Sequence, residues 1–401
     1  AHLMPKTLLS TDRLPDLGDT RTAFAHKSNS DLFKAYWLFR IIGTPWLTAA
    51  GASLTKLALA LHLPIKGVIK ATIFKQFCGG ETVRESLFTA EKLAESGVGT
   101  ILDYSVEGQD DEATLDETTE ELLVGIRAAN GQNKIPFAVF KVTGLARTEL
   151  LEKVSSKDQL TLIETEEWKR VETRFARICK AGYDAGTPVL IDAEDSWTQQ
   201  AIDDLTERQM ALYNKQRAMI FNTLQLYRHD RLTFLKDSFQ RAEQGGYHLG
   251  VKLVRGAYME KERERAEEKG YPDPIQPDKA ACDRDYDASL AFCVEHLDRM
   301  AVVAGTHNEK STLYLAQLMQ ERDIALNDPR IWFSQLLGMS DNISFNMAAA
   351  GYNVVKYMPY GPVSKVLPYL IRRAIENTSA RGQTGRELGL IIAERKRRGK
   401  I

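Results

Sequence analysis

The 401-residue sequence is poor in cysteine and has no excess of either charge. Its four cysteines are scattered, and no two of them have the CxxC spacing of a zinc or redox site. A disulfide framework and a cysteine zinc site are therefore disfavoured, and a reducing compartment is expected. The 53 Lys and Arg residues balance 54 Asp and Glu residues, which leaves a net charge of −1. This balance gives no reason to expect nucleic acid as a partner.

Long hydrophobic runs are also missing. The two most apolar stretches, residues 41–55 and 57–65, contain Pro45 and Pro64 and are shorter than the roughly 18 residues of a membrane-spanning helix. The N-terminal residues lack the pattern of a secretory signal. Two interpretations stay open: a helical arm packed on the main domain, or a surface that contacts a bilayer through residues 33–65. The side chains suited to a membrane interface are Trp37, Trp46, Lys34 and Arg40.

Several binding motifs are absent. Asp283, Asp285 and Asp287 begin like a calcium loop, but Ala288 and Val294 occupy the positions that require Gly and Glu. No HExxH pair is present, so no metal site is expected. Without a GxGxxG segment after a strand or a Walker loop, a Rossmann dinucleotide site and a nucleotide triphosphatase are disfavoured.

From about residue 98 onward, short apolar runs alternate with long amphipathic stretches. This alternation is typical of βα units around a parallel sheet. The predicted strands are Gly99–Tyr104, Phe137–Val142, Pro188–Asp192, Met219–Gln225, Gly250–Val254, Ala301–Gly305, Trp332–Leu336 and Val354–Tyr357. Eight such strands predict an α/β fold of the (β/α)8 barrel type.

The predicted helices fill the intervals between these strands. They are Asp116–Ala129, an extra helix around Glu166–Cys179, Trp197–Lys215, Leu232–Gln244, Asp285–Met300 and Val363–Asn377. We expect three segments: an N-terminal helical arm (1–97), the barrel (98–380) and a basic C-terminal helix (381–401) with a solvated end.

Polar or aromatic residues stand at the carboxyl ends of six predicted strands, where barrel enzymes carry their active sites. They include Lys141, Asp192, Gln225, Lys252, Thr306, His307, Asn308 and Tyr357. Any one of them could have a structural role such as capping the next helix. Six together at one rim favour an active site.

One face of the last barrel helix carries an arginine pair. Tyr369, Arg372, Arg373 and Glu376 are spaced i, i+3, i+4 and i+7. Two guanidinium groups suit a carboxylate, because each can donate parallel hydrogen bonds to it. The alternative is a surface pair with Glu376 as an intrahelical partner.

Several motifs in order along the chain resemble the proline dehydrogenase family. The strongest are KLVRGAY at 252–258, THN at 306–308 and YGPVSKVLPYLIRRAIEN at 360–377, supported by FCGGE at 77–81, LDYS at 102–105 and IDAE at 191–194. The resemblance is greatest to the monofunctional, mitochondrial-type branch.

The resemblance implies a distorted (β/α)8 barrel that holds FAD non-covalently and oxidises L-proline to Δ1-pyrroline-5-carboxylate. It also implies a membrane quinone as electron acceptor. The expected location is the cytoplasmic face of a bacterial inner membrane, or the mitochondrial inner membrane or matrix.

Residue roles are carried over from the matching motifs. Arg372, Arg373 and Lys141 would bind the substrate carboxylate, and Tyr357, Tyr369 and Leu336 would wall the ring. Asp192 and Lys252 match catalytic positions, and Glu81 matches a gate residue that pairs with the first arginine. Lys252 replaces the Arg of many bacterial members, so the charge is kept without the bidentate geometry. FAD contacts are implied for Ala193, Gln225, Val254, Arg255, Gly256, Ala257, Tyr258, Thr306, His307, Asn308 and Glu376.

Other functions remain open at this point. The nearest is hydroxyproline oxidation on the same scaffold, and a second is a catalytically silent flavoprotein that binds membranes. An aldolase or hydrolase with Lys141 as nucleophile is disfavoured, because it leaves the arginine pair and the RGAY segment unexplained.

Overall fold

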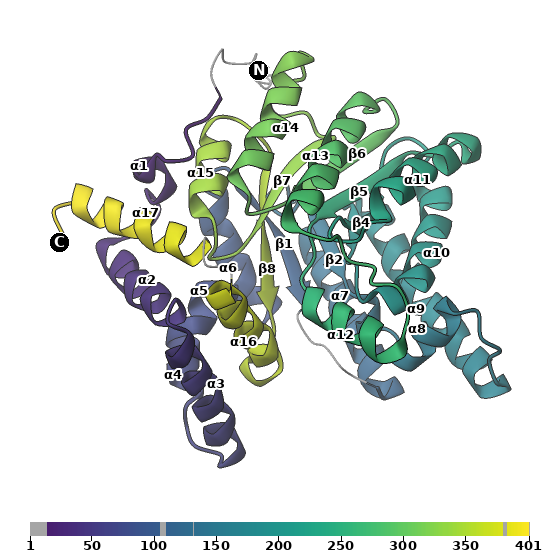
Figure 1. Ribbon diagram of the computed structural model, residues 1–401, viewed down its shortest axis with the longest axis horizontal. Coiled ribbons are helices and arrows are strands. Elements are labelled where there is room, and N and C mark those ends of the chain that lie inside the picture. The colour runs from purple at the N-terminus through teal and green to yellow at the C-terminus, as the bar shows by residue number, and fades with distance from the viewer. Residues whose placement is uncertain (1–13, 105–109, 131, 380–382, 401) are drawn as a thin grey trace. The chain divides into compact units, whose positions relative to one another are not determined.

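The computed structural model describes residues 14–104, 110–130, 132–379 and 383–400, and for residues 375–379 and 383–384 it describes the backbone alone. Eight parallel strands close into a barrel in chain order, which confirms the predicted (β/α)8 fold (Figure 1). The strands are β1 (Val98–Tyr104), β2 (Phe137–Phe140), β3 (Val189–Ile191), β4 (Ile220–Gln225), β5 (Leu249–Val254), β6 (Met300–Gly305), β7 (Ile331–Leu336) and β8 (Val354–Tyr360).

Helices precede the first strand and follow each of the eight strands. Before β1 lie α1 (Thr20–Ala23), α2 (Asn29–Ile42), α3 (Pro45–Ala60), α4 (Lys66–Ile69), a π-helix (Lys70–Phe74), α5 (Lys75–Phe77) and α6 (Val83–Ala94). Among and after the strands lie α7 (Glu112–Ala129), a 3-10 turn (Val142–Gly144), α8 (Thr148–Ser155), α9 (Leu162–Ala185), α10 (Ser196–Tyr213), α11 (Arg231–Gly245), α12 (Met259–Lys269), α13 (Lys279–Glu295), α14 (Glu309–Glu321), α15 (Asp341–Ala349), α16 (Val363–Ser379) and α17 (Gln383–Arg397).

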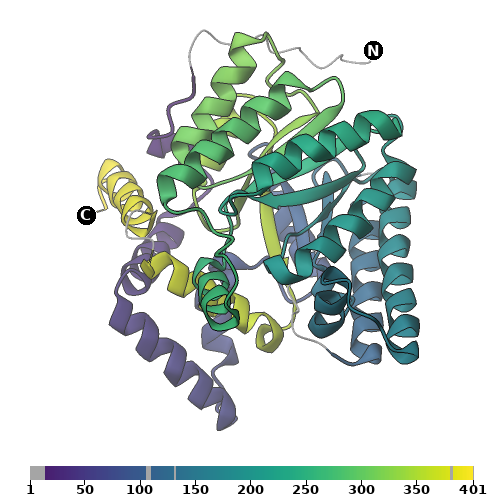
Figure 2. The same cartoon turned by 45° about the vertical axis from the view of Figure 1, so that its right-hand side comes forward.

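The chain divides into two compact units. The first runs through β2–β6 and most of β7, and its helices α7, α9, α10, α11 and α13 lie outside the strands (Figure 2). All six residues of β4 are buried, as expected for a parallel strand covered on both faces. In the strand register of this unit, Lys252 of β5 is paired with Thr223 of β4 and Val303 of β6. The backbone of Lys252 is therefore part of the barrel wall.

The second unit contains the N-terminal helices, β1, β8 and α15–α17. Helix α2 begins at a capping box in which Ser28 and Asp31 bond each other's backbone N–H groups. Large buried side chains of this unit, including Phe39, Phe77 and Leu370, form one apolar cluster that joins α2 to α16 and α17.

Two helix predictions need correction. The helix predicted over Asp285–Met300 ends at Glu295, because the N–H of His296 turns back to the Cys293 carbonyl and Met300 already begins β6. The basic end of α17 is not simply solvated. Arg397 and Arg398 both bond the fully buried carboxylate of Glu394.

Candidate active site

A carboxylate between two lysines forms the centre of the site in the first unit. Asp192 follows β3, Lys141 follows β2, and Lys252 lies within β5. The Lys141 Nζ is 2.8 Å from Oδ2 of Asp192, and the Lys252 Nζ is 2.5 Å from Oδ1. Burial by itself would raise the pKa of Asp192, but the two ammonium groups outweigh it and hold that pKa well below its usual range. The structure therefore joins three residues that the sequence predicted separately.

A second carboxyl group, Glu194, lies two residues further along. The Thr143 N–H and hydroxyl donate to its two oxygens at 3.0 and 2.5 Å, and its own backbone carbonyl accepts from the Gln225 amide at 2.8 Å. Burial raises the pKa of Glu194 from its ordinary 4.5 to about 7, although the bonds from Thr143 oppose this rise. The sequence analysis places Glu194 in the IDAE motif and predicts no role for it. Like Asp192, Glu194 closely follows β3, and this position is the sequence feature that could have indicated a role in the site.

Arg255 organises the next strand ends of the same unit. Its guanidinium group bonds Asp283, Thr306 and Ser311 at 2.8, 2.8 and 2.9 Å. The same group lies 4.2 Å from the centre of the Tyr286 ring. Asp283, whose sequence surroundings fail the calcium-loop pattern, pairs with this arginine. Within the described ranges, no cluster of His, Cys, Asp and Glu could hold a metal ion.

The loop after Arg255 requires glycine. Gly256 has φ +130°, and a Cβ atom there would lie 2.6 Å from ring atoms of Tyr227. The backbone of this loop can thus approach a ligand closely, as phosphate-binding segments do. Ala257 and Tyr258 continue the loop into α12, while Asn308 caps α14 through its side chain.

Apart from Lys141, the residues predicted to bind substrate lie in the second unit. Tyr357 on β8 and Tyr369 on α16 are both buried, and the Arg373 guanidinium carbon lies 5.1 Å from the centre of the Tyr369 ring. Arg372 and Arg373 are half-buried neighbours on α16. Leu336 ends β7 and packs against the apolar cluster of this unit. The side chain of Glu376 lies outside the described residues.

Glu81 contacts two lysines of the N-terminal helices. Its carboxylate is 3.1 Å from the Lys66 Nζ and 2.9 Å from the Lys70 Nζ, and it accepts the Val363 N–H at the start of α16. The bond from Lys70 is the main reason why the pKa of Glu81 falls to about 2. The pairing of Glu81 with Arg372 stays a prediction.

A buried ion pair beside Tyr357 was not foreseen. Lys356 is fully buried on β8, 3.0 Å from a carboxylate oxygen of Asp341. His26 lies 3.7 Å from the other oxygen, and burial lowers the pKa of this imidazole to about 4, although Asp341 opposes that shift. Lys356 follows Val354 and Val355 in an apolar strand, and nothing in the sequence pairs it with Asp341.

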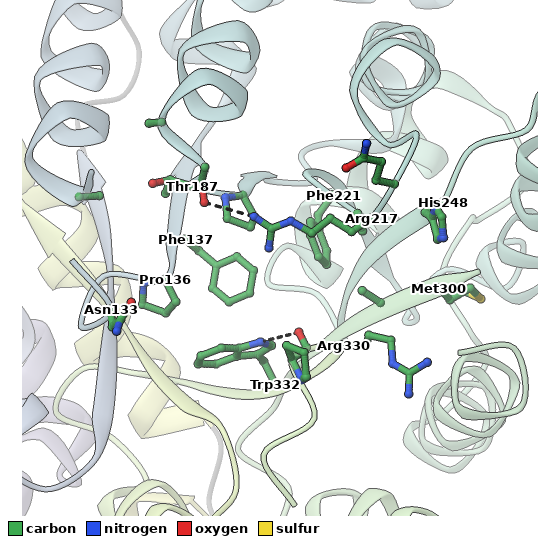
Figure 3. Close-up of a pocket in the computed structure, with 18 of the residues that line it drawn as sticks. Asn133, Pro136, Phe137, Thr187, Arg217, Phe221, His248, Met300, Arg330 and Trp332 are labelled. Carbon is green, nitrogen blue, oxygen red and sulfur yellow. Dashed lines mark hydrogen bonds between the residues drawn. The ribbon is translucent and has the colours of Figure 1, made fainter. Parts of the chain in front are cut away.

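A cavity of about 550 Å3 opens at the amino ends of the strands, opposite the site (Figure 3). Phe137 forms part of its wall, with ring centroids of Phe221 and Trp332 at 5.7 and 5.3 Å. Among the described residues that line it, none is a predicted site residue. Because barrel active sites lie at the carboxyl ends of the strands, we assign this cavity to the stabilising end of the barrel.

Sequence comparisons find similar proteins among those already known. A protein from Pectobacterium carotovorum described as carbapenem antibiotics biosynthesis protein CarD is 37% identical over 80% of this chain and 83% of its own. Mitochondrial proline dehydrogenase 1 of Dictyostelium discoideum is 31% identical over 95% of this chain and 74% of its own. Hydroxyproline dehydrogenase of Xenopus laevis is 31% identical over 94% and 88%.

The fold also resembles a solved structure. Proline utilization A from Bdellovibrio bacteriovorus, inactivated by N-propargylglycine, superimposes with a TM-score of 0.71 at 19% identity. The match covers 92% of this chain and 40% of that one, so this chain corresponds to less than half of that protein. A family model described as Proline dehydrogenase matches residues 86–386. The chain belongs to the proline dehydrogenase family and is an oxidoreductase.

Proposed function

We propose that this enzyme oxidises L-proline to Δ1-pyrroline-5-carboxylate, holds FAD non-covalently and passes the electrons to a membrane quinone. The observation that carries the proposal is the Asp192 carboxylate held between two lysines, Lys141 directly after β2 and Lys252 within β5. A fixed pair of cations around one buried anion is a preorganised electrostatic site, the kind that stabilises charge developing during a reaction.

The residues present suit FAD. The Gly256 loop permits close approach of backbone N–H groups, and Arg255 is held in place by three side-chain partners. Gln225, Thr306 and His307 stand at neighbouring strand ends. We assign these residues to FAD, with Ala193, Val254, Ala257, Tyr258, Asn308 and Glu376 as further contacts. When bound, FAD supplies the acceptor for a hydride and its electron pair.

Lys252 would place a positive charge beside that acceptor. Its ammonium group is anchored on Asp192, so its position is fixed before the reaction. In this assignment Asp192 is a positioning residue for Lys252 and Lys141. A fixed positive charge favours the electron-rich product of hydride transfer.

Arg372 and Arg373 are assigned to the substrate carboxylate, with Lys141 in support. Tyr357, Tyr369 and Leu336 would hold the pyrrolidine ring, and Glu81 would act as the gate. A hydride can leave C5 of proline only when the ring nitrogen carries a lone pair to form the C=N bond. We therefore expect activity to rise with pH as the substrate amine loses its proton.

A second candidate, hydroxyproline oxidation, is favoured by the similarity to a hydroxyproline dehydrogenase. Tyr357 argues against it, because in the family resemblance hydroxyproline-preferring relatives carry a serine at this position. A 4-hydroxyl group packed against the phenol ring would lose its hydrogen bonds to water and would not regain them from the ring. Such an unsatisfied hydroxyl costs about 1–3 kcal/mol of binding free energy.

A dye-coupled assay tests the proposal. Purified protein loaded with FAD should reduce a soluble dye in the presence of L-proline, and an aldehyde reagent for cyclic imines should trap the product. Turnover with trans-4-hydroxy-L-proline but not with L-proline would replace the first candidate with the second. Absence of turnover with both would contradict the two of them.

A further inference from the structure

The buried ammonium group of Lys356 supports the connection between β7 and α15. Lys356 lies on β8, and its Nζ donates to the carbonyl oxygen of Met339 at 2.5 Å and to that of Leu336 at 3.4 Å. The same Nζ is 3.0 Å from a carboxylate oxygen of Asp341, the first residue of α15. Leu336 is the last residue of β7. One side chain therefore contacts both ends of the connection and a carbonyl group within it.

The backbone of this connection is strained. Gly338 has φ +80°, and Ser340, which is not a glycine, has φ +51°. Residues with a side chain are uncommon in this left-handed region and persist where their surroundings fix them, often next to functional sites. Here the N–H of Ser340 donates to the carboxylate of Glu387 on α17, and the carbonyl of Gly338 accepts from the Gln76 side chain on α5. Together with Lys356, these bonds hold the connection from three elements.

Stability alone does not explain an ion pair at this place. The side chains of Lys356 and Asp341 are 0% and 8% exposed, so both charges have lost most of their water. Val354, Val355 and Met358 on the same strand are buried apolar residues. Apolar side chains of similar volume often stabilise a protein as much as a buried ion pair or more, because no charge is desolvated. What an apolar side chain would lack is the donor that fixes the carbonyl groups of the connection.

Lys356 stands beside two of the predicted walls of the substrate ring. Leu336 accepts its hydrogen bond, and Tyr357 is the next residue of β8. The backbone carbonyl of Tyr357 in turn accepts the N–H of Leu337 at 2.9 Å. Successive side chains of a strand point to opposite faces, so the side chains of Lys356 and Tyr357 lie on opposite faces of β8. The link between Lys356 and the two walls therefore runs through the backbone.

We propose that Lys356 is a positioning residue that sets the preference for L-proline over 4-substituted imino acids. By joining the end of β7 to β8, it fixes Leu336 and Tyr357 relative to each other and so limits the width of the ring site. Asp341 neutralises the ammonium charge and holds it at the connection. The inference rests on the proposed function, since it takes these two side chains as walls of the ring site, and it adds a residue that acts on specificity from behind the wall.

A double variant that removes both charges tests the inference in the full-length, FAD-loaded protein. K356M/D341N leaves no unpaired charge in the core but takes away the donor to the carbonyl groups of the connection. In the dye-coupled assay, KM for L-proline should rise on the order of 10-fold while kcat changes by about twofold or less, because the ring is bound less closely and the chemistry is the same. The ratio of kcat/KM for L-proline to that for trans-4-hydroxy-L-proline should fall at least about fivefold. FAD content should stay at the wild-type level.

A second buried ion pair provides the matched control. Arg231 on α11 and Asp203 on α10 are 3.0 Å apart, with side chains 8% and 3% exposed. R231M/D203N removes the same kind of pair. It should leave KM and the specificity ratio at their wild-type values, whatever the change in its thermal unfolding temperature. The ratio is thus a readout that a general loss of stability does not change.

A folded K356M/D341N protein with the wild-type KM and ratio would overturn the inference and leave the proposed function standing, as would an equal fall of the ratio in R231M/D203N. If K356M/D341N does not fold, K356M/D341L replaces it, because an apolar pair of similar volume is often tolerated in a core. The same fall of the ratio is expected there, and a wild-type ratio would again overturn the inference. Wild-type protein that turns over neither imino acid would instead contradict the proposed function.

Discussion

At the scale of single residues, the arginine pair on α16 carries the most specific assignment. Replacing Arg373 by Met should weaken proline binding by about 2–5 kcal/mol, because the substrate carboxylate would be left without its charged partner. Arg373→Lys should bind proline with an affinity between those of the wild type and the Met variant, because lysine keeps the positive charge but lacks the two parallel donors of a guanidinium group. Steady-state kinetics would show the change mainly in KM, with FAD content unchanged. A wild-type KM in the Met variant would rule out the clamp.

Tyr357 should decide between the two imino acids. We expect kcat/KM for L-proline to exceed that for trans-4-hydroxy-L-proline by at least about tenfold, as one poorly accommodated hydroxyl implies. Tyr357→Ser should decrease this ratio, mainly by lowering kcat/KM for L-proline. Competition kinetics with both substrates measures it directly, and equal values in the wild-type enzyme would remove Tyr357 as the discriminating wall.

Glu194 predicts a particular pH dependence of stability. Its pKa rises from 4.5 in the unfolded chain to about 7 in the fold, so the folded state keeps a proton that the unfolded state releases. Stability should therefore fall as the pH increases from about 4.5 to 7, and the loss should persist above pH 7. At about 1.4 kcal/mol for each pH unit, the loss is about 3 kcal/mol at most.

Thermal unfolding of the wild-type protein and of Glu194→Gln measures this dependence. The variant has no carboxyl group to titrate, so its stability relative to the wild type should grow between pH 5 and pH 7 and then level off. A difference between the two proteins that is constant from pH 5 to pH 8 would mean that Glu194 does not titrate with a raised pKa.

At the scale of secondary-structure elements, the strands followed from the sequence almost completely. Short apolar runs such as Ala301–Gly305 became strands because parallel strands are buried on both faces and leave a continuous apolar signal. Helix ends were harder to place. The helix predicted from Asp285 begins at Lys279, where Asp278 caps it, and it ends at Glu295 through a turn that leaves no residue signature.

Contacts between distant elements could not be predicted. The sequence predicts the strands in or after which Lys141, Asp192 and Lys252 stand, but only the fold brings the three side chains within bonding distance. For Lys356 and Asp341, even the involvement of the two residues in a site could not be predicted, because a buried ion pair leaves no periodic pattern in the sequence.

Gly338, in the loop after β7, packs closely against Gln76 of α5. Its φ is +80°, a Cβ atom would overlap the Gln76 carbonyl oxygen, and its own carbonyl accepts from the Gln76 side chain at 2.9 Å. Gly338→Ala should destabilise the protein by about 3 kcal/mol through combined strain and overlap. Gly97 is the control, because its φ is +75° and a Cβ atom would meet nothing within 4 Å.

Gly97→Ala should therefore cost only the conformational penalty of about 1–2 kcal/mol. Denaturant unfolding of the two alanine variants compares these costs. Equal destabilisation would show that the overlap with Gln76 is relieved without cost.

At the scale of the whole molecule, the closed (β/α)8 barrel leads us to expect the chemistry at the carboxyl ends of the strands. The cavity at the amino ends is lined by different residues, so substitutions there should act on stability and not on turnover. The proposed function requires that the protein binds FAD and that L-proline reduces the bound flavin.

The visible spectrum of the purified, FAD-loaded protein under anaerobic conditions tests this claim most directly. We expect an oxidised-flavin band at about 450 nm that belongs to the cofactor and bleaches when L-proline is added. We expect slower and weaker bleaching with trans-4-hydroxy-L-proline. A protein that cannot take up FAD, or one whose bound flavin keeps its colour in saturating L-proline, would contradict the proposed function.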